Sequence, residues 1–469
     1  MEKLKFWYLS LTFFTPFIFR LYLEVVSWPF TTGFDTMAFY LPLLLGYMKI
    51  SWLELYGRAP LYYLIAGGLY RIFGDVMVVI KFVAVLLQGL FGVCLYLWSL
   101  TLYRDSREAL CFSFLVGFYF VTLRLLWDLH RNVLGLVFML LTLWVVNQWD
   151  NRFSVVVSGV LGCLTALSHQ IVPILLAVVL VVKVLRGSRS SFSALVCALV
   201  TWFSVVYASG LVRETTVSRY LGGIIFEASE GPFPSGFEAL GFLLYILLPL
   251  FPFFVVGFVR CWRRREVRVE PVVWLVFCVF LGLFWGLGFR LILLVPFPVM
   301  FYAVHVGKRL RVILFTIVFV FALGYVLFPC WRPFPYFCEP FMWDPSFRCG
   351  LPSSLLQNTV PLDVSDEAFD VALYAVRCLD NDSRGVLLVN RVFIGYVLLA
   401  GAPHDKVVLY GEGYVDPMPW VENLTKEGYV VYFVWWLPNY DWYGWRFGDR
   451  CYGFEVVFVE EPFAVYRWV

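Results

Sequence analysis

Two acidic residues stand in polar stretches beside long apolar runs, where a carboxylate can act on a substrate at a membrane surface. Asp35 lies in TTGFDTMAFYLP, and the apolar, aromatic run that follows it reaches Met48. This run predicts a helix in the plane of the membrane interface, which would hold Asp35 near the lipid headgroups. The alternative is an ordinary helix N-cap, a position where Asp and Thr are common.

Asp128 stands in a second polar stretch, LRLLWDLHRNVLG, together with Arg124, His130 and Arg131. Arg124 and Asp128 are four residues apart, so an ion pair on one helix face is the simpler alternative for both. His130 next to an acid suits a metal ligand, but two donors do not make a site. The chain also contains no Cys-x-x-Cys, so a zinc site is disfavoured. We expect no cofactor, and a divalent metal is possible but not favoured.

Two arginines can bind a substrate anion, and a histidine stands at the end of a predicted span. Arg290 lies in LGFRLILLVPFP, and Arg58 lies in YGRAPLYY. A guanidinium matches the oxygens of a phosphate, so both predict contacts to an anionic headgroup, although an interfacial anchor also explains Arg290. His169 ends an apolar run in ALSHQIVP, where it is either a polar cap or a catalytic residue.

The composition indicates a membrane protein that crosses the bilayer many times. Of 469 residues, 61% are apolar, 20% are aromatic and only 15% are charged. The mean hydropathy is +0.80. Soluble domains contain about 25% charged residues. The net charge of +3 argues against a nucleic-acid-binding protein. Nucleotide-driven and common hydrolase chemistry are disfavoured because the chain has no Walker loop, no His-Glu-x-x-His and no Gly-x-Ser-x-Gly.

The elements that must position these residues are apolar helices. We predict eleven transmembrane helices, at about 6–26, 76–102, 109–126, 133–149, 153–169, 171–185, 192–210, 238–258, 271–288, 291–306 and 312–329. Sixteen Lys and Arg lie in one set of loops and eight in the alternate set, so we place the N-terminus in the cytoplasm of a multi-pass cell-membrane protein. Residues 27–75 then form one large external loop, whose 14-residue apolar run at 60–73 is too short to favour a span. Arg20 and Glu24 interrupt the first span and are spaced to pair with each other.

The composition of the C-terminal part predicts a separate domain. We divide the chain into a transmembrane domain, residues 1–330, and an extracytoplasmic α/β domain, residues 331–469. In the latter, the pattern predicts a helix at 365–379 with Ser365 as its N-cap. Strands at 385–390, 406–410 and 429–436, with helices at 391–400 and 417–427 between them, predict βαβ units. A hairpin around Glu460–Pro462 follows. Five of the eleven cysteines lie beyond the spans and predict one or two disulfides, and sequons at Asn381 and Asn423 fit an external surface.

The chain resembles the C-type (GT-C fold) glycosyltransferases, which take sugars from polyprenyl (dolichyl-type) phosphate donors and include the protein O-mannosyltransferases and the aminoarabinose transferase of lipid A. The likeness covers roughly residues 1–330. It rests on Asp35 with Tyr40, on RAPLYY and RIFG, on WDLHRN around Asp128, on SHQ at His169 and on Arg290.

The resemblance implies an inverting sugar transfer on the extracytoplasmic side of the membrane. Asp35 matches the acid that acts as general base on the acceptor, and Asp128 matches the acid that shapes the acceptor or sugar pocket. Arg58 and Arg290 match cations that hold the donor phosphate, and the remaining expected substrate contacts are Tyr40, His130, Arg131 and His169. The chain departs from the family in Thr36 after Asp35 and in Ala59–Pro60 in place of paired prolines. The acidic pair of the metal-binding oligosaccharyltransferase branch is missing near Asp128, which favours a metal-independent branch and leaves the acceptor open.

Two other classes of function compete with this one. A transporter or flippase for lipid-linked substrates also needs many spans and interior charges. Carriers often have two similar halves, and we find no such repeat here. A membrane scaffold whose C-terminal domain binds a partner is the other alternative.

Overall fold

The computed structural model describes residues 2–48, 50–212, 236–284, 289–327, 359–360, 364–411, 416–438, 440 and 453–468. The chain forms two compact units. The first comprises Met1–Leu23, Ile50–Gly68 and Phe82–Leu327, and the second comprises Glu24–Lys49, Leu69–Lys81 and Phe328–Val469. The last segment of the second unit begins near the predicted domain boundary at 330. The unit also takes in two segments from the beginning of the chain, so the predicted external loop 27–75 is shared between both units.

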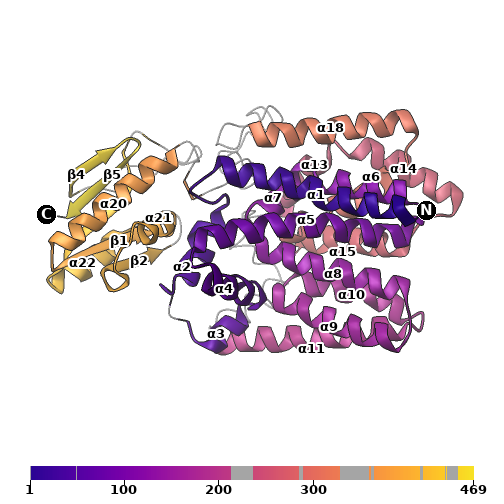
Figure 1. Cartoon of the computed structure of the whole chain (residues 1–469), viewed down its shortest axis with the longest axis horizontal. Coiled ribbons are helices and arrows are strands. Elements are labelled where there is room, and N and C mark those ends of the chain that lie inside the picture. The colour runs from indigo at the N-terminus through magenta and orange to yellow at the C-terminus, as the bar shows by residue number, and fades with distance from the viewer. Residues whose placement is uncertain are drawn as a thin grey trace. The chain divides into compact units, whose positions relative to one another are not determined.

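The first unit is built of helices (Figure 1). They are α1 (Glu2–Val26), α3 (Trp52–Gly57), α4 (Leu61–Phe73), α5 (Val76–Tyr103), α6 (Ser106–Gly117), α7 (Phe120–Asp128), α8 (His130–Gln148), α9 (Arg152–Ser168), α10 (Val172–Val184), α11 (Arg189–Val212), α13 (Gly236–Leu247), α14 (Phe251–Arg264), α15 (Val269–Phe284), α16 (Phe289–Ile292), α17 (Pro296–Ala303) and α18 (Lys308–Leu327). Parts of α1, α4 and α5 belong to the second unit.

Several of these helices can cross a membrane. In the described ranges, Phe6–Val26, Val76–Tyr103, His130–Gln148 and Arg189–Leu211 are long and apolar enough for a span. A fifth is possible if the bent pair Ser106–Gly117 and Phe120–Trp127 counts as one. Others, such as Arg152–Ser168 and Val172–Val184, are apolar but shorter. The chain therefore has the character of a membrane protein, and the number of eleven spans stays a prediction.

Two predicted spans are broken. The span at 109–126 consists of α6 and α7, which meet at an angle of 64°. The span at 291–306 is split between α16 and α17, and α17 starts at Pro296. Proline lacks a backbone N–H and is well placed in the first turn of a helix, so it favours a new start there.

Helices α9 and α11 lie side by side at close range (Figure 1). A Cβ on Gly162 would lie 2.6 Å from the carbonyl oxygen of Ala194, and one on Gly159 would lie 2.8 Å from Ser193 Oγ. Small residues of this kind let apolar helices approach closely, and van der Waals packing then holds them together.

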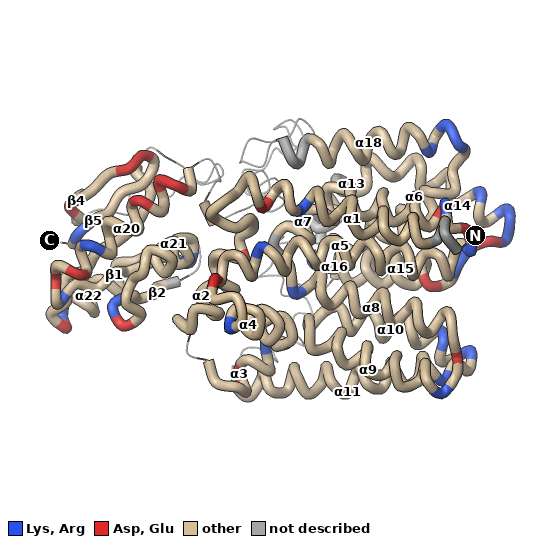
Figure 2. The backbone as a smooth tube through the Cα atoms, viewed as in Figure 1, with Lys and Arg blue, Asp and Glu red and all other residues tan. Residues whose placement is uncertain are grey.

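Figure 2 shows that basic residues gather at one end of the first unit's helices. This end includes the last turn of α14 and the first turn of α18, together with the turn between α10 and α11 (Figure 2). These positions belong to the set of loops that the charge bias assigns to the cytoplasm. The clustering agrees with that assignment, although the side of each terminus stays a prediction.

The second unit contains a five-stranded sheet in the order β2-β1-β3-β5-β4. Its elements are α20 (Ser365–Asn381), β1 (Gly385–Asn390), α21 (Ile394–Leu399), η6 (His404–Lys406), β2 (Val407–Gly411), α22 (Met418–Lys426), β3 (Val430–Trp436), β4 (Phe454–Glu460) and β5 (Phe463–Trp468). Strand β1 is parallel to β2 and β3, and β5 is antiparallel to β3 and β4. The predicted βαβ units and terminal hairpin are confirmed. The predicted cap is wrong, because Ser365 is the first helical residue and its Oγ accepts a hydrogen bond from Tyr396 Oη at 3.1 Å.

The cysteines leave the disulfide prediction open. Cys378 is a free thiol on α20. The other four cysteines beyond the spans, Cys330, Cys338, Cys349 and Cys451, lie outside the described residues.

The segment around Asp35 belongs to the core of the second unit. It forms η1 (Thr36–Tyr40), a π-helix, followed by α2 (Leu41–Leu44). Met37 and Leu41 are buried in one hydrophobic cluster with residues of β1 and α21. A Cβ on Gly395 of α21 would lie 2.7 Å from the carbonyl oxygen of Met37. The predicted helix after Asp35 therefore exists, but these two apolar side chains pack against protein, so they are not available to lipid.

A buried ion pair in the second unit joins the end of α1 to the start of α5. Lys81 Nζ lies 3.2 Å from Glu24 Oε2 and donates to the carbonyl oxygens of Glu24 at 2.7 Å and of Phe30 at 2.5 Å. Ser27 Oγ accepts a further bond from Lys81 at 3.1 Å, and Thr32 Oγ1 donates to Glu24 Oε1 at 3.1 Å. These contacts fix the chain between α1 and Asp35.

Candidate functional site

The loop that carries Arg58 is fixed by a short helix and a sharp turn. Helix α3 starts after Ser51, whose Oγ accepts a hydrogen bond from Glu54 N at 3.1 Å, and ends at Gly57. Ala59 then takes a positive φ of 57°, which turns the chain into α4. Arg58 Nη2 lies 2.5 Å from Glu54 Oε1, four residues earlier. The carboxylate of Glu54 therefore neutralises Arg58, and the i,i+4 spacing was a signal for this pair that the sequence analysis did not use.

Helix α3 is held closely against α11 and the turn after α9. Tyr56 Oη and Ser204 Oγ are 2.7 Å apart, and Gln170 Nε2 donates to the carbonyl oxygen of Gly57 at 2.6 Å. A Cβ on Gly57 would lie 2.7 Å from the backbone N and Cα of Ser209. Only glycine fits this approach without a shift of one of the two backbones.

This packing predicts the effect of a methyl group at Gly57. We expect Gly57→Ala to lower the free energy of unfolding by about 1–3 kcal/mol, because overpacking forces helices apart. Thermal unfolding of the purified protein measures the change. Gly68→Ala is the matched control, since a Cβ there meets nothing within 4 Å in helix α4. It should raise stability by about 0.5–1 kcal/mol, and a similar loss in both variants would contradict the packing argument.

The break between α7 and α8 carries Asp128, His130 and Arg131. Arg20 of α1 is buried here, and its two terminal nitrogens donate to the carbonyl oxygens of Leu126 at 2.8 Å and of Trp127 at 3.0 Å. These are carbonyls of the last turn of α7, which lack partners within the helix. Arg20 thus holds the end of α7 at Asp128. The pairing of Arg20 with Glu24 stays a prediction. The structure adds these carbonyls as partners of Arg20 and Lys81 as a partner of Glu24.

His130 and Arg131 face helix α4. His130 is buried, and its Nδ1 lies 3.1 Å from the hydroxyl of Tyr62. The guanidinium carbon of Arg131 lies 5.3 Å from the centre of the Tyr63 ring, and an Arg131 nitrogen donates to the carbonyl oxygen of Arg58. Tyr62 is a site residue that the sequence analysis missed. Its position in RAPLYY, next to the tyrosine that was noted, was the available signal.

His169 is the C-cap of α9, as one of the two sequence interpretations held. It is buried, and its Nδ1 accepts a hydrogen bond from Ile171 N at 3.1 Å. The charges of Arg290 and Arg131 both act on this ring. Arg290 itself is half-buried on α16. The structure therefore brings five of the predicted residues into one group, which we call the Arg–His cluster: Arg58, His130, Arg131, His169 and Arg290.

The remaining predicted site residues, Asp35, Tyr40 and Asp128, are not part of the Arg–His cluster. Asp35 and Tyr40 belong to the second unit. Asp35 is half-buried with helical φ and ψ of −60° and −26°, and its carboxylate makes no capping hydrogen bond to the helix that follows. The N-cap alternative is therefore not supported. The backbone of Asp128 ends α7, and its side chain is outside what the structure describes.

The Arg–His cluster has the chemistry of an anion site. Guanidinium groups bind phosphate oxygens through paired N–H donors. Arg131 and Arg290 carry such guanidinium groups, and Arg58 forms an ion pair with Glu54. In the described ranges, no group of three or more His, Cys, Asp or Glu is arranged to hold a metal ion. Metal independence stays a prediction.

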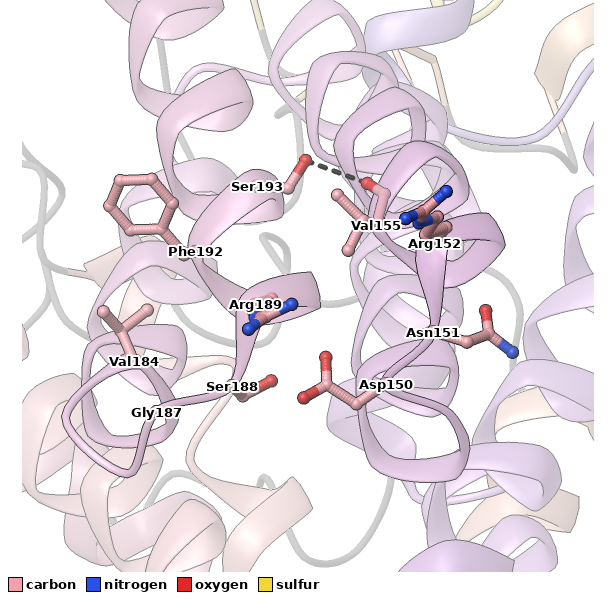
Figure 3. A pocket seen from close by; sticks show the side chains of 10 residues that line it. All are labelled: Asp150, Asn151, Arg152, Val155, Val184, Gly187, Ser188, Arg189, Phe192 and Ser193. Atoms are coloured by element: carbon pink, nitrogen blue, oxygen red, sulfur yellow. Dashed lines mark hydrogen bonds between the residues drawn. The ribbon is translucent and has the colours of Figure 1, made fainter.

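A separate cavity of about 760 Å³ lies where α9 and α11 begin (Figure 3). It is lined by Asp150, Asn151, Arg152, Val155, Val184, Gly187, Ser188, Arg189, Phe192 and Ser193. Ser190 N donates to the carboxylate of Asp150 at 3.0 Å, which lowers the pKa of that carboxyl. Ser193 Oγ donates to the carbonyl oxygen of Val155 (Figure 3). The cavity shares no residue with the Arg–His cluster.

Comparison with known proteins finds a similar fold but no relative in sequence. No family model matches the chain, and no curated protein matches it in sequence. Among solved structures, it is similar to the oligosaccharyltransferase of Archaeoglobus fulgidus in the apo form, with a TM-score of 0.51 and 13% identity. The match covers 92% of this chain and 70% of that chain. The chain thus shares the fold of that structure, and its apolar helices have the character of a membrane protein. Membership of the GT-C glycosyltransferases stays a prediction. The finer resemblance to O-mannosyltransferases and to the aminoarabinose transferase stays a prediction.

Proposed function

We propose that the protein is a membrane glycosyltransferase that moves a sugar from a polyprenyl-phosphate donor to an acceptor on the extracytoplasmic side. The observation that carries the proposal is the Arg–His cluster on a fold shared with an oligosaccharyltransferase. Arg131 and Arg290 would hold the donor phosphate, and their fixed charges would stabilise the negative charge that develops on it. The acceptor is a hydroxyl or an amine of a protein, lipid or glycan.

The proposed reaction is a single displacement. The acceptor atom attacks the anomeric carbon while its proton passes to the carboxylate of Asp35. The bond from the anomeric carbon to the phosphate oxygen breaks, and its electron pair leaves with the polyprenyl phosphate. Attack in line with the leaving group inverts the anomeric carbon. Asp128 would shape the acceptor or sugar pocket, and Tyr40, Arg58, His130 and His169 would complete the substrate contacts.

Proteoliposomes test this function directly. The purified protein is incubated with polyprenyl-phosphate-linked sugars and candidate acceptors, and released polyprenyl phosphate and glycosylated product are measured by mass spectrometry. A nucleotide sugar serves as the comparison donor and should give no transfer. Movement of the intact lipid-linked sugar across the bilayer, without cleavage of its phosphate bond, would support the flippase alternative instead.

Arg290 provides a quantitative test of donor binding. We expect Arg290→Gln to lower kcat/KM for the donor by about 10- to 100-fold, because hydrogen bonds to a charged group are worth about 1.5–3 kcal/mol. Arg290→Lys should recover part of the loss, since lysine keeps the charge but not the forked donors. Arg71→Gln changes an exposed arginine of α4 and should leave kcat/KM unchanged. A wild-type kcat/KM in Arg290→Gln would remove Arg290 from the donor site.

A further inference from the structure

Arg391 of the C-terminal α/β domain contacts the helical segment that carries Asp35. It follows the last residue of β1 and is half-buried. Its guanidinium carbon lies 4.3 Å from the centre of the Phe39 ring, within the range of a cation–π interaction. Phe39 comes four residues after Asp35 in helical backbone, so the two side chains share a face. The contact therefore brings a fixed positive charge to the face of the segment that presents Asp35.

The backbone on both sides of this contact is held firmly. Asn390 is fully buried, and its Oδ1 accepts a hydrogen bond from Val392 N at 3.1 Å. Its Nδ2 donates to the hydroxyl of Tyr410 at 3.2 Å. The carbonyl of Met37 lies against Gly395, where even a Cβ would not fit. These contacts anchor the turn at Arg391 to β1 and pack the π-helix against α21. The contact between Arg391 and Phe39 is a further link between the two segments.

The place of Arg391 in the sheet supports a functional role. Strand β1 lies between β2 and β3 and is parallel to both. After β1 the chain forms β2 on one side of it and then β3 on the other side. In open α/β sheets, the carboxyl ends of strands at such a switch point are where ligand-contacting residues lie. Arg391 stands at this carboxyl end. Through its contact with Phe39 it binds the helical segment after Asp35, which belongs to the same unit.

We propose that Arg391 is a positioning residue for Asp35, held through Phe39, and that the α/β domain thereby contributes to the transfer reaction. This inference rests on the proposed function of Asp35. Arg391 is not required to touch the substrate. Loss of its guanidinium would let the Asp35 segment move relative to the acceptor, and a small misplacement of a reacting group strongly lowers the rate.

The test compares Arg391→Met, Arg391→Lys, Phe39→Leu and the double variant Phe39→Leu/Arg391→Met with wild type. Arg384→Met, at an exposed arginine of the same domain, is the matched control. The measurements are kcat and donor KM for sugar transfer, Tm, and hydrogen–deuterium exchange of residues 33–41.

We expect Arg391→Met to lower kcat by about 10-fold, with donor KM and Tm nearly unchanged. Exchange in residues 33–41 should become faster, and Arg391→Lys should restore most of both properties because lysine keeps the cation–π contact. The double variant should be no worse than the more damaged single variant, since both remove the same contact. Arg384→Met should behave as wild type.

Unchanged kcat and unchanged exchange in Arg391→Met would overturn the proposal, and so would additive losses in the double variant. A fall in Tm without a change in kcat would also overturn it, because that result describes a purely structural contact. If wild type transfers no sugar, the proposed function fails, and the exchange of residues 33–41 still decides whether Arg391 positions the segment.

Discussion

Asp35→Asn is expected to lower kcat for sugar transfer by about 10²- to 10⁴-fold, the usual contribution of a general base. Asparagine has nearly the same shape as aspartate but cannot accept the proton that leaves the acceptor. The fold should tolerate the change, because asparagine keeps the size of the side chain and one of its two oxygens. Transfer from a polyprenyl-phosphate donor in proteoliposomes measures kcat, and thermal unfolding measures stability.

Asp75→Asn is the matched control for this substitution. Asp75 lies in the second unit, and its Oδ1 accepts hydrogen bonds from Met77 N at 2.8 Å and Val78 N at 3.1 Å at the start of α5. Asparagine is as good an N-cap as aspartate, so both activity and Tm should remain those of wild type. If Asp35→Asn were equally active, Asp35 would have no part in the mechanism, and another base would have to be found.

Lys81→Met is expected to cause the largest loss of stability, about 3–5 kcal/mol in the free energy of unfolding. Lys81 is 6% exposed and forms an ion pair with Glu24, which is 3% exposed. Methionine fills a similar volume but leaves a buried carboxylate without this cation. It also leaves the carbonyls of Glu24 and Phe30 without this donor. The expected result is a clear fall in the thermal unfolding midpoint of the purified protein.

The partner variant decides whether the ion pair is the cause. Glu24→Gln/Lys81→Met removes both charges and should lose less stability than the two single variants added together, because no uncompensated charge remains. Lys308→Met, at the exposed start of α18, should have little effect. Losses that simply add would show that the attraction between Lys81 and Glu24 is not the cause of the lost stability. This comparison remains informative even if Lys81→Met folds poorly.

Local patterns predicted the elements of the C-terminal α/β domain well. The alternation of short β-rich runs with helical runs marked β1, β2 and β3, and the turn at Glu460–Pro462 marked the hairpin of β4 and β5. These features depend on side-chain periodicity and turn residues, which act over a few positions. The same holds for the apolar helices, whose existence follows from long apolar runs. The breaks within these helices are harder to predict from the sequence. The 64° bend after α6, for example, contains no proline that would indicate it.

Local sequence patterns could not predict contacts between residues that are far apart in the chain. Spacing suggested that Arg20 pairs with Glu24, but it did not predict that Arg20 binds carbonyls more than a hundred residues away in sequence, or that Glu24 pairs with Lys81. Likewise, the pattern after Asp35 suggested a helix at the lipid surface, whereas Met37 and Leu41 are buried against the α/β domain. A local pattern shows that a residue needs a partner but not which partner the fold brings to it.

Residue types and their order along the chain were enough to predict a multi-pass membrane protein, a small α/β domain and a set of residues suited to lipid-phosphate chemistry. Tertiary structure alone decided that Arg58, His130, Arg131, His169 and Arg290 form one group, and that Arg391 reaches the Asp35 segment. The physical reason is that burial and charge pairing act between side chains that meet only after the helices have packed.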